Sequence, residues 1–172
     1  MKEFAQWLAG TYPSVLIQQH NSWAIPVIQS IHIAAIAILV GSALLIEARI
    51  LGWAGPDQTL RQTTNRFGPW ITGSLWVLLV TGVLMVIGEP ARELLTFSFW
   101  AKMFLVAVGA IIAVLFLRAV RRNESRWEEA AQRGPAKLAA VVTCLMWVSI
   151  IILGRLIAYD HIWGSWSPAT VR

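Results

Sequence analysis

The chain is poor in cysteine and in charge, and both shortages narrow what it can be. Cys144 is the single cysteine in 172 residues, which excludes a disulfide framework and a CxxC motif. Charged residues make up 13% of the chain, against about 25% in a typical soluble domain. Because hydrophobic residues make up 57%, a soluble fold of this size could not bury enough of them, and lipid is the predicted solvent.

Motifs of the large soluble enzyme classes are missing as well. The sequence has no Gly-rich phosphate loop, nucleophile elbow or HExxH motif, and its apolar runs hold no carboxylate pair. The net charge of +5 comes from basic residues between the apolar runs. Such residues set membrane topology and contact anionic lipids. Without a nucleic-acid-binding motif, nucleic acid is not a predicted partner.

What the sequence does have is four long apolar runs. Each is long enough to cross the hydrocarbon core of a bilayer, which takes roughly 20 helical residues. The runs lack the alternation of barrel strands, so the predicted fold is all-α: a polytopic membrane protein with a bundle of four transmembrane helices, in a single membrane domain covering residues 1–172. The predicted spans are about 23–46, 70–88, 95–117 and 138–163.

The basic residues predict the orientation of these spans. Nine of the fourteen lie in two connecting segments, 47–69 and 118–137, which the positive-inside rule assigns to the cytoplasm. Both termini are then periplasmic, and the expected location is a bacterial inner membrane. Phe4, Trp7 and Leu8 have helical spacing, so segment 1–22 is predicted to be a periplasmic interfacial segment, with a poorly ordered tail as the alternative.

Polar residues inside the spans are costly, so each is a candidate for function. His32 lies nine residues after Trp23 and Arg155 lies eight before Trp163, depths of about 13 Å and about 12 Å at 1.5 Å per residue. If the first and fourth helices are neighbours, both side chains face one polar pocket in the periplasmic leaflet. The other residues predicted around this pocket are Gln29, Lys102, Met85 and Met103, with Glu89, Glu93, Asp160 and His161 at its mouth.

The chemistry of this set favours a redox cofactor. A neutral imidazole can ligate haem iron, copper or zinc, which makes His32 the predicted metal ligand. Arg155 and Lys102 can hold haem propionates or a quinone oxygen, and Met85 or Met103 can be a second axial ligand. A b-type haem is the first expectation, with quinone or copper as alternatives. A structural interpretation stays open, in which His32 hydrogen-bonds to a neighbouring helix and the methionines fill apolar space.

Three stretches also carry a resemblance to known proteins. IQSIHIAAIAILVGSALLIEARILG, FWAKMFLVAVGAIIAVLF and WVSIIILGRLIAYD resemble a family of four-helix bacterial inner-membrane proteins with no assigned activity, at His32, Gly41, Arg49, Lys102 and the run 154–159. A more distant similarity links the chain to the haem-binding protoporphyrinogen oxidase of bacteria, to copper-resistance D proteins and to membrane b-type cytochromes. That similarity implies haem, copper or quinone handling. Because the second and third runs lack a histidine, it leaves open a five-coordinate haem, a His/Met haem or a haem shared with a partner.

Three functions follow as hypotheses. The first is a cofactor-binding electron-transfer protein that works between a periplasmic partner and the quinone pool. The second is a non-catalytic accessory or anchor subunit of a larger membrane complex, bound to other membrane or periplasmic subunits. The third is a small transporter for copper or a weak acid, which the lack of an interrupted mid-span helix disfavours. The clustering of His32, Arg155 and Lys102 in one leaflet favours the first.

Overall fold

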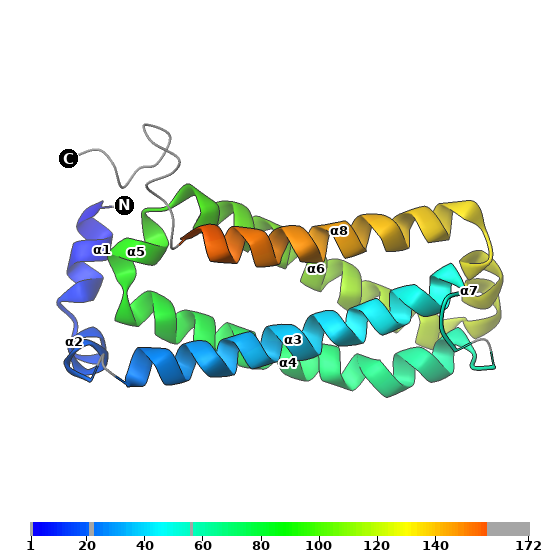
Figure 1. The fold of residues 1–172 in the computed structure, drawn as a ribbon, viewed down its shortest axis with the longest axis horizontal. Helices are drawn as coiled ribbons and strands as arrows, with labels where there is room; N and C mark the ends of the chain where they lie inside the picture. Colours follow the sequence, from blue (N-terminus) through cyan, green and yellow to red (C-terminus); the bar gives the residue numbers. More distant parts are fainter. Residues whose placement is uncertain (1, 21–22, 56, 158–172) are drawn as a thin grey trace. The chain divides into compact units, whose positions relative to one another are not determined.

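The structure is a computed structural model that describes residues 2–20, 23–55 and 57–157. The predicted all-α fold is confirmed, because the described residues form eight helices and no strand (Figure 1). The helices are α1 (Lys2–Ala9), α2 (Tyr12–Gln19), α3 (Ala24–Leu51), α4 (Leu60–Gly88), α5 (Pro90–Leu94), α6 (Phe97–Arg122), α7 (Glu124–Ala131) and α8 (Gly134–Leu156).

Four of these helices, α3, α4, α6 and α8, are long and apolar enough to cross a membrane. The shortest of them, α8, has 23 residues, a length of about 34 Å at 1.5 Å per residue, against a hydrocarbon core of about 30 Å. Only 28% of the most apolar window of α3, 22% of that of α4 and 17% of those of α6 and α8 is buried. The rest of this apolar surface needs lipid, so the chain is an integral membrane protein.

The helices extend past the apolar runs that predict them. α4 begins at Leu60 rather than near Trp70, because Thr59 and Gln62 form a capping box ahead of the apolar run. The Thr59 hydroxyl accepts from the Gln62 backbone N–H at 3.2 Å, and Gln62 Oε1 accepts from the Thr59 N–H at 2.9 Å. The end of the fourth predicted span, with Asp160, His161 and Trp163, lies outside the described residues.

The chain divides into two compact units. Unit 1 comprises residues 1–34, 77–106 and 150–172, and unit 2 comprises residues 35–76 and 107–149. Each unit contains a segment of all four long helices; unit 1 adds α1, α2 and α5, and unit 2 adds α7.

In unit 1 the N-terminal segment is helical and rests on α5. α1 packs against α5 (Figure 1), and Ala5 of α1 joins Leu94, Phe99 and Ile157 in a buried apolar cluster. The aromatic side chains of α1 point away from this cluster, since Trp7 is 65% exposed. α1 is thus an amphipathic helix whose apolar outer surface suits an interfacial position.

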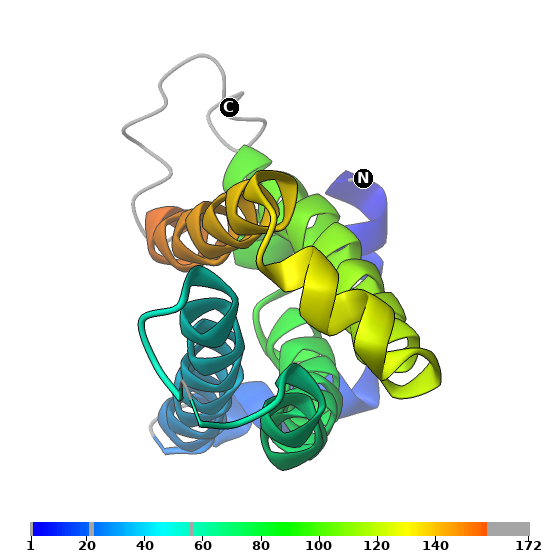
Figure 2. The ribbon, with the colours of Figure 1, turned by 90° about the vertical axis from the view of Figure 1, so that its right-hand side faces the viewer.

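In unit 2 a polar network joins α7 to the loop between α3 and α4. Arg49 pairs with Glu128 at 2.5 Å and also donates to the Gln58 carbonyl at 2.6 Å, while Glu128 accepts from the Leu60 backbone N–H at 2.6 Å. Glu124 of α7 accepts from Arg61 at 3.0 Å, and this hydrogen bond lowers the pKa of Glu124. Figure 2 shows α7 and this loop from the side on which they face the viewer.

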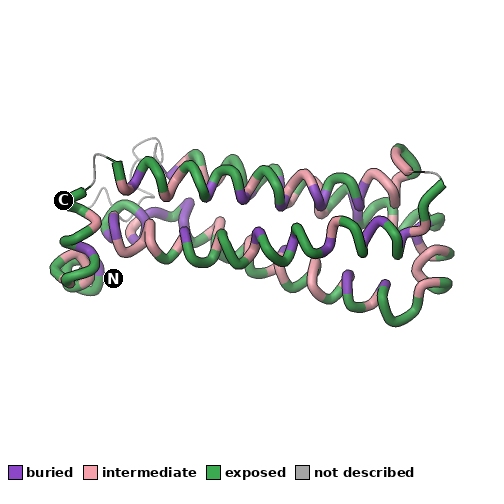
Figure 3. Tube along the Cα trace, turned by 90° about the horizontal axis from the view of Figure 1, so that it is seen from below, coloured by how far each residue is buried: buried purple, intermediate pink, exposed green. Residues whose placement is uncertain are grey.

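Burial along the long helices is confined to narrow stripes, which appear in Figure 3 as isolated purple positions between exposed turns. On α3 the buried residues Ile25, His32, Leu39 and Ile46 follow one another at intervals of seven, the spacing of a helix–helix seam. Trp147 of α8 is 4% exposed and packs inside. Trp76 of α4 is instead 69% exposed. It lies outside the buried stripe of its helix, so we expect it to contact lipid.

Candidate functional site

His32 lies on the buried stripe of α3 in unit 1, and its place is fixed by α4. The side chain is 9% exposed, and Nδ1 lies 2.7 Å from the Thr81 hydroxyl. The next residue of α4 is Gly82, where an added Cβ would lie 3.8 Å from Cε1 of His32. Thr81 and Gly82 therefore supply a polar contact and the room for the ring.

The hydrogen bonds of Thr81 indicate which nitrogen of His32 carries the proton. The Thr81 hydroxyl donates to the Val77 carbonyl at 2.7 Å, the usual bond of a threonine to the preceding helical turn. Its oxygen is then left to accept, so Nδ1–H of His32 is the donor and the lone pair falls on Nε2. A histidine held in this way by a second residue presents one fixed nitrogen as a ligand or base.

Lys102 of α6 and Glu93 of α5 are the charged residues that act on this part of unit 1. Lys102 lies close enough to His32 and to Glu93 for their charges to interact. Its side chain also runs beside Gly154 of α8, where an added Cβ would lie 3.7 Å from Nζ. Lys102 is thus the residue that interacts with both the histidine and the carboxyl, and Gly154 lies beside its side chain.

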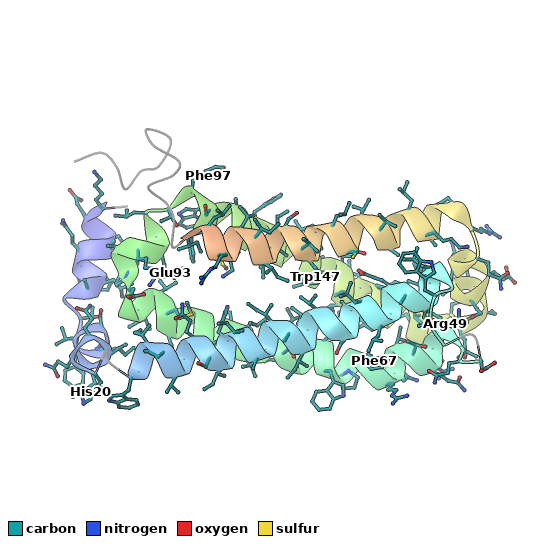
Figure 4. All side chains as sticks on the ribbon, viewed as in Figure 1. His20, Arg49, Phe67, Glu93, Phe97 and Trp147 are labelled. Carbon is teal, nitrogen blue, oxygen red and sulfur yellow. The ribbon has the colours of Figure 1, made fainter. Side chains whose placement is uncertain are left out.

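Glu93 (labelled in Figure 4) is 4% exposed, although it lies outside the membrane-spanning helices. Burial raises the pKa of Glu93 above its usual value of 4.5, while the charges of Lys102 and Arg92 act in the opposite direction. Arg92 is itself engaged in an ion pair with Glu89 at 2.7 Å. The carboxyl of Glu93 is therefore a buried group whose charge is only partly balanced.

The remaining predicted site residues differ in how far they are buried. Gln29 and Met85 are half-buried in unit 1, Arg155 is exposed on α8, and Met103 is 41% exposed on α6. Of the residues predicted at the mouth, Glu89 and Glu93 are described, whereas Asp160 and His161 lie outside the described residues. Among the residues that the structure describes, no three His, Cys, Asp or Glu side chains form a group that could hold a metal ion.

Two features of the site were not foreseen in the sequence. Thr81 has a sequence signal only as a small residue within an apolar run, because its pairing with His32 depends on helix register. Glu93 follows Pro90 in a polar connection between two apolar runs, a context that suggests an exposed residue. Its burial comes from the packing of α1 on α5, which local sequence does not reveal.

The arrangement provides one fixed imidazole nitrogen, one neighbouring ammonium and one buried carboxyl. This set can ligate a metal centre from one side, balance an anionic substituent of a bound group, and exchange protons. No curated protein and no solved structure matches the chain. The family model described as "Family of unknown function (DUF6644)" matches residues 4–160, and the chain therefore belongs to that family.

Proposed function

We propose that this integral membrane protein binds an electron-carrying cofactor, a b-type haem, with Nε2 of His32 as the iron ligand. The observation that carries the proposal is the contact between His32 Nδ1 and Thr81, 2.7 Å long. Histidines that ligate metals commonly donate their other ring N–H to a fixed acceptor, which sets the tautomer and the ring orientation. This contact leaves Nε2 of His32 as the nitrogen that would bind the iron.

Lys102 supports a haem because the propionate groups of a haem are anionic. The charge of its ammonium acts on His32. The ammonium would balance a propionate inside the membrane, where an unpaired charge is costly. Arg155 is the second predicted cation for this role, and Gln29, Met85 and Met103 complete the proposed set, with half-buried Met85 rather than exposed Met103 as the better second ligand. A bound haem would supply one-electron redox chemistry.

Quinone and copper are the alternatives for the same site. A quinone oxygen needs a hydrogen-bond donor, and Lys102 is the residue near His32 that supplies one. Copper favours imidazole with thioether ligands, which again involves Met85. The free lone pair on Nε2 suits a metal ligand better than a contact to a quinone oxygen. The haem is preferred to copper because Lys102 can balance a propionate.

In the proposed orientation, the His32 site lies in the periplasmic leaflet of the membrane. Nine of the fourteen basic residues lie in the segments 47–69 and 118–137, so the positive-inside rule places those segments in the cytoplasm of a bacterial cell. The N-terminal end of α3, and with it His32, is then at the periplasmic side. Electrons would pass between a periplasmic partner and the quinone pool of the inner membrane.

A reduced-minus-oxidised visible spectrum of the detergent-purified protein tests the proposal. We expect a Soret shift and an α-band that are lost in His32→Ala and kept in His20→Ala, since His20 is exposed and bonds to the Leu16 carbonyl. Thr81→Val should weaken haem binding by about 10- to 100-fold, and Thr81→Ser should retain it. A folded protein without haem, copper or quinone after purification from membranes would contradict the proposal.

A second candidate, an accessory subunit without a cofactor, is favoured by the outer surface of α1 and α2. Phe4, Trp7 and Tyr12 are 53%, 65% and 79% exposed, more aromatic surface than two short helices need for their own packing. These residues would contact a neighbouring subunit. A photo-crosslinking residue at position 7 that captures one defined protein in membranes, from a chain that binds no cofactor, would support this function instead.

A further inference from the structure

Unit 2 contains a cavity of about 430 Å³ that is separate from the His32 site. Its wall is formed by α3, α4, α6, α7 and α8, and it is almost wholly apolar. The residues that matter for its chemistry are Leu60, Ile71, Phe116, Trp127, Trp147 and Glu47; Trp147 is labelled in Figure 4. The volume falls within the range of small-molecule sites, roughly 300 to 1,000 Å³.

Glu47 is the one ionisable residue in this wall. It is 7% exposed, and its Oε2 is buried without a hydrogen-bond partner among the described residues. Arg49, two residues further along α3, is engaged with Glu128 and the Gln58 carbonyl. A carboxyl in apolar surroundings is stable only as the neutral acid or when a cation pairs with it, and no described basic residue forms an ion pair with Glu47.

The other polar group of the wall is the hydroxyl of Thr143 of α8. The Thr143 hydroxyl lies beside Glu47 and directs its proton to the carbonyls of Ala139 and Ala140, each at 3.0 Å. Its oxygen can accept a hydrogen bond. The wall therefore offers a ligand one carboxyl and one hydroxyl oxygen, both suited to a donor, among aromatic rings that also attract cations.

We propose that the cavity binds a hydrophobic ammonium ion, an amine whose charged group donates hydrogen bonds to Glu47 and Thr143 while its apolar body fills the aromatic wall. A lipid chain would fill the same apolar space but would leave the carboxyl of Glu47 unsatisfied. An ammonium ion satisfies both the charge and the hydrogen bonds.

Binding of the ammonium ion is coupled to loss of the Glu47 proton. In the empty cavity the neutral acid can donate to Thr143, and the bound cation replaces that proton as the partner of the carboxylate. The titratable group that faces Glu47 is Cys144 of α8; the residues that α4, α6 and α7 contribute to the wall are not ionisable. Each amine that binds beside a neutral Glu47 therefore releases that proton to the solvent.

Calorimetric titration of the protein in lipid nanodiscs with 1-adamantanamine, and with 1-adamantanol as its uncharged counterpart, tests this site. We expect the amine to bind with a heat that depends on the buffer, as proton release requires. Glu47→Gln should weaken amine binding by about tenfold or more and leave binding of the alcohol unchanged. Glu129→Gln, at an exposed position of α7, is the matched control and should bind as the parent does.

Ala113→Phe, which fills the cavity from α6, should abolish binding of both compounds if they occupy it. The proposal is overturned if the amine does not bind, if amine and alcohol bind equally well, or if Glu47→Gln changes neither. Equal binding of both compounds would identify an apolar space that lipid or any hydrophobic molecule fills. These outcomes are independent of the haem spectrum, because Glu47 and His32 belong to different units.

Discussion

His32 and Glu47 are two buried polar residues of α3 that differ in whether their polar atoms have hydrogen-bond partners. His32 has its Nδ1 paired with Thr81 of the neighbouring helix at 2.7 Å, and its second nitrogen is available. Glu47 has one carboxyl oxygen buried without a partner in the part of the chain that the structure describes. A buried polar atom costs free energy when it lacks a partner. His32 therefore has the features of a fixed ligand, whereas Glu47 has those of a group that a bound molecule would stabilise.

The sequence identified His32 as a candidate because a histidine interrupts an apolar run. Glu47 and Arg49 come at the end of that run, a position typical of residues at the membrane interface. The structure anchors Arg49 through Glu128 but buries Glu47 at 7% exposure. The difference arises because α3 continues to Leu51, so residue 47 still lies within the helix and on its inner face. Whether such a residue is buried depends on the helix register and on where the helix ends. Neither can be predicted from the local composition.

Glu93 gives a prediction for the pH dependence of stability. Its pKa in the folded protein is raised above 4.5, so ionisation costs more in the folded than in the unfolded chain. The free energy of unfolding should therefore fall as the pH rises from 4.5 through the raised pKa, and stay low above it. Glu93→Gln should remove this fall and raise the melting temperature at neutral pH.

Thermal unfolding of the detergent-solubilised protein between about pH 4 and about pH 8 measures this difference. Glu129→Gln is the control, since Glu129 is exposed and should leave the pH profile as it is. If Glu93→Gln melts at a lower temperature than the parent at neutral pH, the ionised carboxyl is net stabilising, and the attraction of Lys102 outweighs burial.

At the scale of helices, apolar runs predicted that four helices exist but not where each one ends. α4 starts ten residues before its apolar core because the Thr59–Gln62 capping box and the Glu128 carboxylate satisfy its first backbone N–H groups. One of these partners comes from α7, far away in sequence. The sequence also did not predict which face of each helix turns inward, because the faces toward lipid are as apolar as those toward protein. Trp76 and Trp147 both lie in apolar runs, yet Trp76 is exposed and Trp147 is buried.

Gly88 of α4 lies in close contact with side chains of α2 and α3, and this contact gives a prediction for stability. A Cβ at this position would lie 2.7 Å from Ile25 Cδ1 and 2.9 Å from Ile17 Cγ2, so the side chains of α3 and α2 would have to move. Gly88→Ala should destabilise the protein by about 1 to 3 kcal/mol. Gly73→Ala on the same helix meets nothing within 4 Å and should be neutral or stabilising by up to about 1 kcal/mol.

Thermal denaturation of the two variants side by side in the same detergent compares them directly. Helix propensity favours alanine at both positions, so the contrast isolates the contact with α2 and α3. Equal melting temperatures for Gly88→Ala and Gly73→Ala would mean that the N-terminal helices do not pack on α4 as described.

At the scale of the molecule, composition alone established an integral membrane protein, because so much apolar surface has no other solvent. The orientation of the chain is a separate matter that rests on charge. Arginine and lysine are concentrated in segments 47–69 and 118–137, and basic segments resist transfer across the membrane. With those segments in the cytoplasm, the end of α3 that carries His32 would begin at the periplasmic surface, and an electron partner for His32 would have to come from that side.

Single cysteines tested with a membrane-impermeant maleimide in intact cells decide the orientation. Cys144 is the one native cysteine, so Cys144→Ser gives a background without thiols. Glu3→Cys should react in intact cells, whereas Asp57→Cys and Ser125→Cys should react only after permeabilisation; all three positions are exposed. The reverse pattern would place residue 3 in the cytoplasm. The haem proposal would survive that result, but the partner of His32 would then have to be cytoplasmic, because an electron carrier can exchange electrons only with a protein that reaches its side of the membrane.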